Sequence, residues 1–277
     1  MNLKTVSVVM AVYIKDNPEY FQKAIFSVLQ QSYPITELII VADGPITQEL
    51  TNVINFFTEK FNNLCFLQLS ENKGPATARN FGILNTKSDF IAIMDADDLC
   101  HKDRIKKQIE ILSNDNIDIV STFLVEFIDE NDIDLNKVHK MPVLHHDIRK
   151  MAAISCPIAS ATILGKSSIL KKYNYNTALK VGEDYSLWIQ MLQADIKFQA
   201  VPEPLYFYRT NGDFGSRRNG WKYAKSDFIN KIKALNLVSW YLVPFLCLMA
   251  FIGSFVRMLP PSIFVRVRNI LHNILRK

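Results

Sequence analysis

The sequence predicts an α/β fold with a mostly parallel central sheet. In its first half, short apolar runs of strand length alternate with longer segments that have helical character. This alternation is typical of parallel sheets, in which crossover helices join the strands. The 277 residues are 49% hydrophobic and 21% charged, which supplies enough apolar surface for one large core. We therefore expect one main domain, residues 1–233, followed by a distinct segment, residues 234–277.

The first four expected strands are apolar runs that end at turn-forming residues. They span residues 6–12, 37–42, 64–69 and 90–94. The helix after the first strand is expected because one face would carry Phe21, Ala24, Ile25, Val28 and Leu29. Two further helices, residues 48–61 and 76–85, are expected between the later strands.

Beyond residue 95 the elements are spaced less regularly. A helix over 103–113 would place Ile105, Ile109 and Leu112 on one side, and a strand over 117–127 follows. Residues 129–144 form a polar connection, and strand character resumes over 158–164. The last helix of the main domain is expected over 183–194, where it would bury Leu187, Trp188, Met191 and Leu192.

An acidic cluster directly follows the fourth expected strand. Asp95, Asp97 and Asp98 would lie at the carboxyl edge of the sheet, where open α/β folds bind ligands. Carboxylates this close repel one another, and a divalent cation such as Mg²⁺ or Mn²⁺ would neutralise them while sharing substrate phosphates. The alternative is an acidic loop that only caps the helix beginning near Asp103.

Other phosphate-binding and hydrolytic motifs are absent from the sequence. It contains no GxGxxG, no complete P-loop, no serine nucleophile elbow and no HExxH. A metal-dependent phosphatase would need its nucleophilic aspartate after the first strand, whereas this cluster follows the fourth.

Five short segments occur in a characteristic order. They are SVVMAVY at 7–13, VADGP at 41–45, NKGPATARNFGI at 72–83, MDADD at 94–98 and GEDYSLW at 182–188. In this order the chain resembles the inverting glycosyltransferases of family 2, which have the GT-A nucleotide-sugar-binding fold. The resemblance covers residues 5–218 and implies that the main domain binds a nucleotide-diphosphate sugar.

The resemblance also implies which residues bind the donor. The end of the first strand would line the uracil and ribose pocket, with Asp43 near the base. The other residues expected to border the nucleotide sugar are Ala11, Val12, Tyr13, Lys73, Gly74 and Arg79. Asp95 would meet the ribose or the sugar and, together with Asp97, hold the metal on the diphosphate.

The same resemblance places the catalytic base in the pair Glu183 and Asp184, with Asp184 as the base and Glu183 as a capping or acceptor-binding group. An inverting transfer needs a carboxylate that accepts the proton of the attacking hydroxyl, so the assignment fits the chemistry. Acids also favour the first turn of a helix, which is the simpler explanation of this pair.

One position departs from the family pattern. Thr210 and Asn211 stand where relatives often carry a histidine that helps to bind the metal or the diphosphate. Arg217 and Arg218 follow, and either could bind the leaving diphosphate in a bidentate manner. The alternative is a solvated basic loop.

The last segment combines an apolar stretch with basic residues. Residues 234–256 carry no charge, and the formal charge of +5 is accounted for by Arg257, Arg266, Arg268, Arg276 and Lys277. The stretch is long enough to cross a bilayer, but prolines and a glycine divide it and its more basic flank comes after it. We expect a hairpin or an in-plane segment, then a basic amphipathic helix on an anionic membrane surface. A helical pair packed on the main domain or at a dimer interface is the alternative.

Together these observations predict an inverting, metal-dependent transferase that moves a sugar, most simply from a UDP-sugar, to a saccharide or lipid-linked saccharide of a surface polysaccharide. Nucleic acid is not an expected partner, because the main domain has no basic stripe. Four widely spaced cysteines and a beginning without a signal-peptide pattern predict the cytoplasmic face of the plasma membrane. The alternatives are a catalytically idle sugar-nucleotide-binding scaffold and, more weakly, a nucleotidyltransferase.

Overall fold

The computed structural model describes residues 3–210, 220–256 and 258. Its strands are β1 (Val6–Val12), β2 (Glu37–Ala42), β3 (Leu64–Gln68), β4 (Phe90–Asp95), β5 (Leu99–Cys100), β6 (Ile119–Phe127), β7 (Val138–His139), β8 (Leu164–Lys166) and β9 (Phe198–Arg209). The main-domain helices are α1 (Pro18–Leu29), α2 (Gln48–Lys60), α3 (Pro75–Asn85), α4 (Arg104–Leu112), α5 (His145–Ala152), α6 (Ser167–Lys172) and α7 (Glu183–Gln193). Two longer helices follow, α8 (Trp221–Ala234) and α9 (Val243–Val256), and the short 3-10 helices are η1 (Glu130–Asp132), η2 (Ser160–Thr162), η4 (Leu235–Leu237) and η5 (Trp240–Leu242).

The described strands form one mixed sheet in the order β3-β2-β1-β4-β8-β6-β9-β5, with β7 paired to β6. The first four strands in this order are all parallel, as predicted. The other half is mixed, because β8 runs antiparallel to both β4 and β6, whereas β9 runs parallel to β6. The mostly parallel sheet predicted from the sequence is therefore confirmed for the N-terminal half and corrected for the rest.

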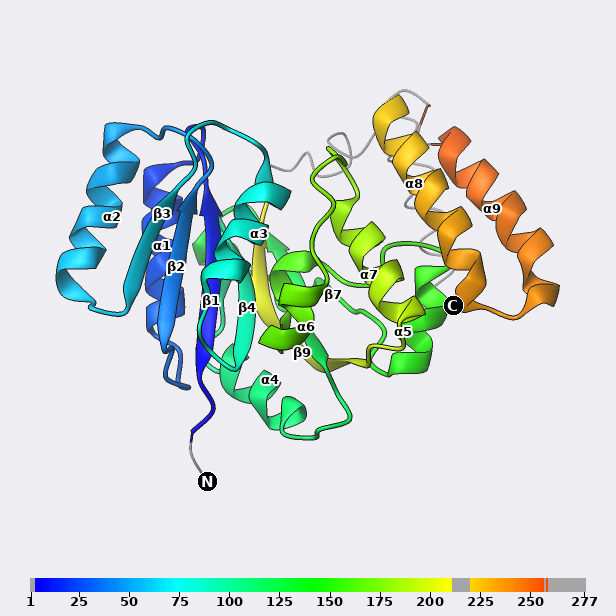
Figure 1. Cartoon of the computed structure of the whole chain (residues 1–277), viewed down its shortest axis with the longest axis horizontal. Helices are drawn as coiled ribbons and strands as arrows, with labels where there is room; N and C mark the ends of the chain where they lie inside the picture. The colour runs from blue at the N-terminus through cyan, green and yellow to red at the C-terminus, as the bar shows by residue number, and fades with distance from the viewer. Residues whose placement is uncertain (1–2, 211–219, 257, 259–277) are drawn as a thin grey trace.

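Helices cover both faces of the sheet (Figure 1), and each face has its own core. On one face α1, α2 and α4 pack against alternate strand residues such as Val8, Met10 and Ile40. On the other face α3, α5, α6 and α7 pack against the intervening residues, including Val9 and Ile39. Because successive strand residues point to opposite faces, the uninterrupted apolar strands are explained by burial on both sides.

The ends of the first helices are fixed by local sequence. The side chain of Asn17 accepts hydrogen bonds from the backbone N–H groups of Glu19 and Tyr20, and Pro18 occupies the first turn of α1. Thr47 caps α2 in the same way. These caps begin each helix just beyond the carboxyl end of a strand, so the connecting loops gather at one edge of the sheet.

The prediction of a strand over residues 158–164 is wrong. Residues 160–162 form η2 instead, and β8 begins only at Leu164. Buried Arg104 lies against this segment, and its guanidinium donates to the backbone carbonyls of Ala161 and Ile163 at 2.8 and 3.1 Å. The Ile163 carbonyl also accepts the backbone N–H of Ile93 on β4. The carbonyls of this turn thus satisfy the charge of Arg104 where water cannot reach it.

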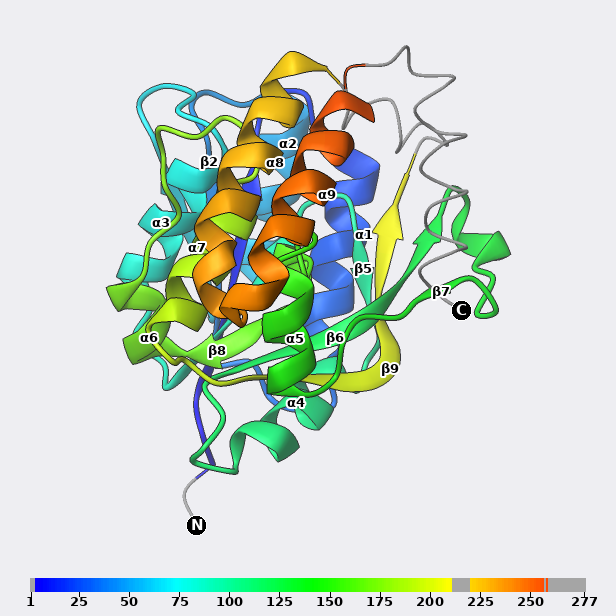
Figure 2. The ribbon, with the colours of Figure 1, turned by 90° about the vertical axis from the view of Figure 1, so that its right-hand side faces the viewer.

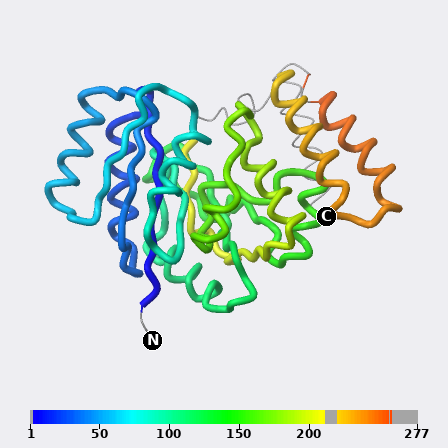
Figure 3. Tube along the Cα trace, in the orientation of Figure 1, coloured from blue at the N-terminus to red at the C-terminus, as the bar shows by residue number. Residues whose placement is uncertain are grey.

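The two C-terminal helices pack side by side and lie over α5 and α7 (Figure 2). The chain trace places them at the end of the molecule opposite β3 and α2 (Figure 3). The uncharged stretch from residue 234 does not form one helix, since η4 and η5 precede α9. Within the described ranges, no helix has the length and apolar character needed to cross a membrane. The basic amphipathic helix expected beyond residue 258 lies outside the described residues.

Candidate active site

Four segments meet at the carboxyl edge of the parallel half-sheet. They are the loop after β1, the loop after β2 together with residues 71–74, the acidic loop after β4, and the start of α7. Parallel strands bring these segments together because their carboxyl ends share one edge. At the end of β1, Ala11 lies in register with both Val41 and Asp95. Val12 is buried and Tyr13 is exposed.

Asp43 organises the loop before α3. The two oxygens of its buried carboxylate accept the backbone N–H groups of Lys73 and Gly74 at 2.7 and 2.9 Å. Gly74 has a φ of +92°, a conformation that side chains rarely tolerate. The structure thus brings together three residues predicted to bind the nucleotide, and it shows Asp43 supporting the loop. Contact of Asp43 with a base stays a prediction.

Arg79 joins the acidic loop to the start of α7. Its Nη2 lies 2.7 Å from Oδ1 of Asp95, and its Nη1 lies 3.6 Å from Oε1 of Glu183. Burial lowers the pKa of this arginine, but the charges of Asp95 and Glu183 contribute to a net rise, so the guanidinium stays charged. Its Nε is buried and has no hydrogen-bond partner among the described residues. These three predicted residues form one network.

The acidic loop after β4 contains carboxylates in different environments. Asp98 is fully buried, and its two oxygens accept the hydroxyl of Tyr206 and the backbone N–H of Arg209, each at 2.7 Å. Burial raises the pKa of Asp98 well above its ordinary value, and the nearby charge of Asp97 adds to this. Asp95 and Asp97 are half-buried. The loop therefore turns one carboxylate into the core and keeps two at its surface.

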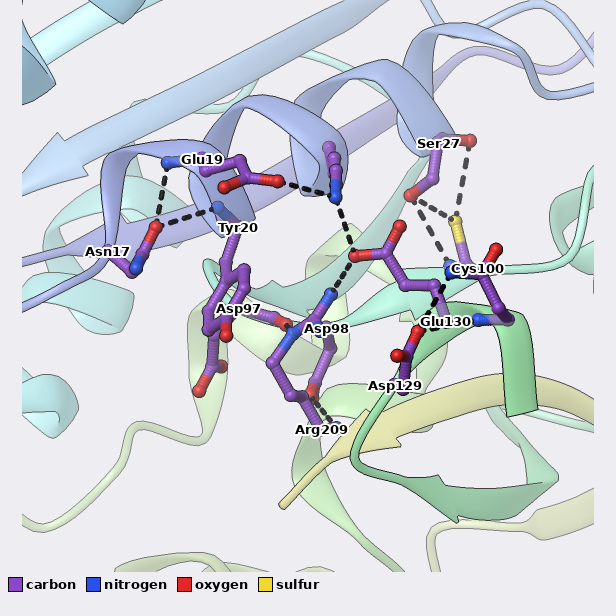
Figure 4. A network of polar contacts seen from close by, with 12 residues as sticks. Asn17, Glu19, Tyr20, Ser27, Asp97, Asp98, Cys100, Asp129, Glu130 and Arg209 are labelled. Atoms are coloured by element: carbon purple, nitrogen blue, oxygen red, sulfur yellow. Dashed lines mark hydrogen bonds and ion pairs between the residues drawn. The ribbon is translucent and has the colours of Figure 1, made fainter. Parts of the chain in front are cut away.

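Arg209, the last residue of β9, contacts the backbone of the acidic loop after β4 (Figure 4). Its Nε donates to the backbone carbonyl of Asp97 at 2.7 Å, and its Nη2 lies 2.6 Å from Oε1 of Glu130. The guanidinium also packs over the rings of Tyr20 and Phe127. Sequence reasoning did not assign Arg209 to the site, because the contact joins strands that are over a hundred residues apart.

The acids at the start of α7 follow a turn that requires glycine. Gly182 has a φ of +71°, and a Cβ at this position would lie 2.6 Å from Oγ of Ser226 on α8. Asp184 is half-buried, and its Oδ1 accepts the backbone N–H of Tyr185 at 2.7 Å. Burial and the charge of Asp184 raise the pKa of Glu183. Both acids therefore lie in the first turn, as the simpler interpretation required, while Glu183 also reaches the Arg79 network.

Asp16, in the loop after β1, was not predicted from the sequence. Its Oδ2 accepts the backbone N–H of Tyr13 at 2.9 Å. Burial raises its pKa to about 7, and the charges of Asp97 and Asp95 act in the same direction. Its position after a strand, at the edge where α/β folds bind ligands, is the signal that could have identified it.

We expect Asp16→Asn to change how stability depends on pH. A carboxyl whose folded pKa of about 7 exceeds its ordinary 3.8 favours folding only while protonated, so that contribution is lost as the pH rises between these values. The variant should therefore gain Tm relative to the unmodified protein across this range, and the gain should level off above about pH 7. Thermal unfolding with a chelator present measures the difference.

Asp134→Asn is the control for this measurement. The pKa of half-buried Asp134 is lowered by the backbone N–H of Asn136, so this variant should lose Tm relative to the unmodified protein as the pH rises. A flat Tm difference for Asp16→Asn over the same range would contradict the raised pKa.

The acidic loop fits a cation that is shared with a diphosphate. Magnesium and manganese ions at such sites take one or two carboxylates, and substrate phosphates complete the coordination. Asp97 and the Asp95 oxygen that does not face Arg79 would be the carboxylates for such an ion, whereas both oxygens of Asp98 are already bonded. In the described part of the chain, no three His, Cys, Asp or Glu side chains gather closely enough to form a metal site. Arg217 and Arg218 lie outside the described residues.

Comparison with known proteins agrees with this site. The family model described as glycosyl transferase family 2 matches residues 7–173. The loop before α3, residues 71–74, and the acidic loop after β4 fall within this range, and the chain belongs to this family.

Two curated relatives cover most of the chain. The amylovoran biosynthesis glycosyltransferase AmsE of Erwinia amylovora is 27% identical over 80% of this chain and 82% of its own length. An Escherichia coli enzyme, UDP-Gal:alpha-D-GlcNAc-diphosphoundecaprenol beta-1,3-galactosyltransferase, is 29% identical over 92% of both chains. The chain is therefore a glycosyltransferase whose relatives include enzymes of polysaccharide biosynthesis.

Solved structures share the fold at lower identity. Staphylococcus aureus TarS in complex with UDP superposes with a TM-score of 0.65 and 18% identity, covering 88% of this chain and 69% of that one. The mannosyltransferase PcManGT of Pyrobaculum calidifontis, in complex with GDP-Man and Mn²⁺, gives a TM-score of 0.65 and 15% identity, covering 97% and 80%. The predicted GT-A fold is confirmed.

Proposed function

We propose that the protein is an inverting glycosyltransferase that moves a sugar from a UDP-sugar to a saccharide acceptor of a surface polysaccharide. The observation that carries this proposal is the Arg79 network. It links Asp95, beside the expected metal ligand Asp97, with Glu183, beside the expected base Asp184. The carboxylate for the leaving diphosphate and the carboxylate for the acceptor hydroxyl thus border one site.

In this proposal Asp184 takes the proton of the acceptor hydroxyl. The hydroxyl oxygen of the acceptor attacks the anomeric carbon from the face opposite the diphosphate, and the bond to the diphosphate breaks. The half-buried position of its carboxylate, in the first turn of α7, keeps it accessible to an acceptor. Asp97, with Asp95, would hold a divalent cation, which when bound balances the charge developing on the diphosphate. Arg79 holds Asp95 in place through their ion pair.

The choice of donor and acceptor is supported by the relatives. The Escherichia coli relative is named for UDP-Gal and for a GlcNAc-diphosphoundecaprenol acceptor, and AmsE for amylovoran biosynthesis. We therefore propose a UDP-sugar as the donor and a lipid-linked saccharide as the acceptor, with the enzyme bound to the cytoplasmic face of the plasma membrane.

The experiment that tests the donor is isothermal titration with UDP, GDP, CDP and dTDP, each with and without Mn²⁺. We expect UDP to bind, and Mn²⁺ to strengthen its binding. Tight binding of another nucleotide would replace the proposed donor, while failure of all four to bind folded protein would contradict the function. UDP binding without breakdown of any UDP-sugar in the presence of acceptors would favour an idle scaffold.

Asp97→Ala should abolish the metal-dependent part of UDP binding. Because Asp97 is a proposed ligand of the cation on the diphosphate, we expect the affinity measured with Mn²⁺ to fall by about tenfold or more, towards the value without metal. Titration of UDP with and without Mn²⁺ measures both values. Asp115→Ala, which removes an exposed carboxylate after α4, is the matched control and should bind UDP normally. Equal stimulation by Mn²⁺ in both variants would remove Asp97 from the metal site.

A further inference from the structure

The helices α8 and α9 expose an apolar surface at one end of the molecule. Six large side chains of η5 and α9 form what we term the apolar face: Trp240, Tyr241, Phe245, Leu248, Phe251 and Phe255. Trp240 is 83% exposed and Phe251 is 65% exposed, values far above those of a core residue. Contiguous exposed apolar surface of this kind marks an interaction site in a soluble domain.

The opposite side of α9 is fixed to the domain. Leu246 and Ala250 are buried, and a Cβ on Gly253 would lie 2.9 Å from Nζ of Lys231 on α8. Lys231 in turn pairs with Asp227 on its own helix at 2.8 Å, with both side chains largely buried. The apolar face is therefore held outward by close helix packing on its inner side.

The exposed charged side chains of α8, the helix that packs on α9, have one sign. On α8 the side chains of Lys222, Lys225 and Lys233 are exposed, while Asp227 is already paired. In the sequence after residue 256, five basic residues occur and no acidic one. An aromatic and aliphatic face bordered by lysines complements a bilayer, whose headgroups are anionic and whose acyl chains are apolar. A second copy of this chain would bring a like charge to the same place.

We propose that the apolar face of η5 and α9 docks into the interfacial layer of an anionic bilayer, with α9 parallel to the membrane plane. Fourteen residues of α9 extend about 21 Å, and the packing on α8 holds this length against the domain surface. The phenylalanines would enter the acyl boundary, and Trp240 and Tyr241 would lie at headgroup depth. This inference deepens the proposed function, since it rests on an acceptor carried by a membrane lipid.

The helix α8, on which α9 packs, contacts the turn before the proposed base Asp184. On α8, Ser226 Oγ donates to the carbonyl of Val181 at 2.8 Å, and buried Asn230 donates to the carbonyl of Gly182 at 3.1 Å. Asp184 follows this turn by two residues. Docking of α9 would thus fix the orientation of the active site relative to the membrane through α8, which packs on α9 and hydrogen-bonds to this turn.

Vesicle co-sedimentation of the full-length protein tests the proposal. We expect binding to vesicles of phosphatidylcholine with phosphatidylglycerol, weaker binding to phosphatidylcholine alone, and a decrease at high salt. The double variant Phe245→Ser/Phe251→Ser should bind anionic vesicles at least about tenfold more weakly, because it removes two exposed aromatic side chains that docking would bury in the bilayer. The matched control is Phe26→Ser/Phe56→Ser, which removes two exposed phenylalanines from α1 and α2 and should bind as the unmodified protein.

Tryptophan fluorescence reports the depth of docking. In a Trp221→Phe background the remaining tryptophans are Trp240, which is exposed, and Trp188, which is fully buried. Anionic vesicles should shift the emission to the blue, and lipids brominated near the headgroup should quench it more than lipids brominated near the chain end. Unchanged emission, or deeper bromines that quench more strongly, would overturn the in-plane arrangement.

Two other outcomes would overturn the proposal. In the first, the unmodified protein is a dimer, the double phenylalanine variant is a monomer, and neither binds vesicles. This result would assign the apolar face to contact with a second copy of the chain. The second is vesicle binding that this variant retains in full. Titration with UDP separates the two hypotheses, because the double variant should keep normal UDP affinity. If the unmodified protein does not bind UDP but still binds vesicles, the proposed function is contradicted and membrane docking is not.

Discussion

Asp184→Asn is expected to lower kcat by about 10²- to 10⁴-fold, the usual contribution of a general base. Asparagine keeps the size of the side chain, and its carbonyl oxygen can still accept the backbone N–H of Tyr185. It cannot take the proton of the acceptor hydroxyl. UDP affinity should change little, since the donor is bound by other residues. Initial rates with a UDP-sugar and a lipid-linked acceptor measure kcat, and titration with UDP measures donor binding.

The matched control is Asp147→Asn, because Asp147 also lies in the first turn of a helix, α5, and is half-buried like Asp184. If Asp184 acted only on the helix dipole, both variants would lose about 0.3 to 1 kcal/mol of stability and keep their kcat. We expect that pattern for Asp147 alone. A near-normal kcat for Asp184→Asn would remove this residue from the proposed base role. Product stereochemistry, read by NMR of the new glycosidic bond, tests inversion separately.

Arg209→Ala is expected to destabilise the protein by about 1.5 to 3 kcal/mol, the range for a hydrogen bond to a charged group, and to weaken UDP binding in the presence of Mn²⁺. The guanidinium holds the carbonyl of Asp97 and lies against Glu130, which also pairs with Lys23 at 3.1 Å. Without it, the acidic loop loses the contact that fixes its backbone. Urea unfolding measures the stability, and titration with UDP and Mn²⁺ measures donor binding.

Arg149→Ala separates loss of stability from loss of loop position. Arg149 also donates to backbone carbonyls, those of Leu237 and Leu192, but it lies on α5 away from the acidic loop. The Arg149→Ala variant should be less stable than the unmodified protein and still bind UDP with normal affinity in the presence of Mn²⁺. Arg209→Lys keeps the charge but loses the planar donor pair, so we expect it to recover part of the stability and little of the affinity. Equal UDP affinity in the two alanine variants would contradict a positioning role for Arg209.

The sequence by itself determined the first four strands and the helices between them. β1, β2 and β4 are apolar because both of their faces are buried, whereas the edge strand β3 buries only its first residue, Leu64. Polar motifs follow the ends of these strands. The acidic loop and the acids of α7 could be predicted for the same reason, since motifs that follow parallel strands must gather at one edge. The order of the motifs sufficed to indicate the family, which the comparisons confirm.

The tertiary structure alone decided how charged side chains are used. The sequence does not distinguish Asp98 from its acidic neighbours. In the structure its carboxylate is buried and accepts hydrogen bonds from the Tyr206 hydroxyl and the Arg209 backbone N–H, both on β9. From the sequence, Arg104 is expected at the surface of an amphipathic helix, yet it is buried and donates to backbone carbonyls of residues 161 and 163. Such contacts depend on chain segments far apart in sequence, and the free energy of burying a charge is set by partners that only the folded chain supplies.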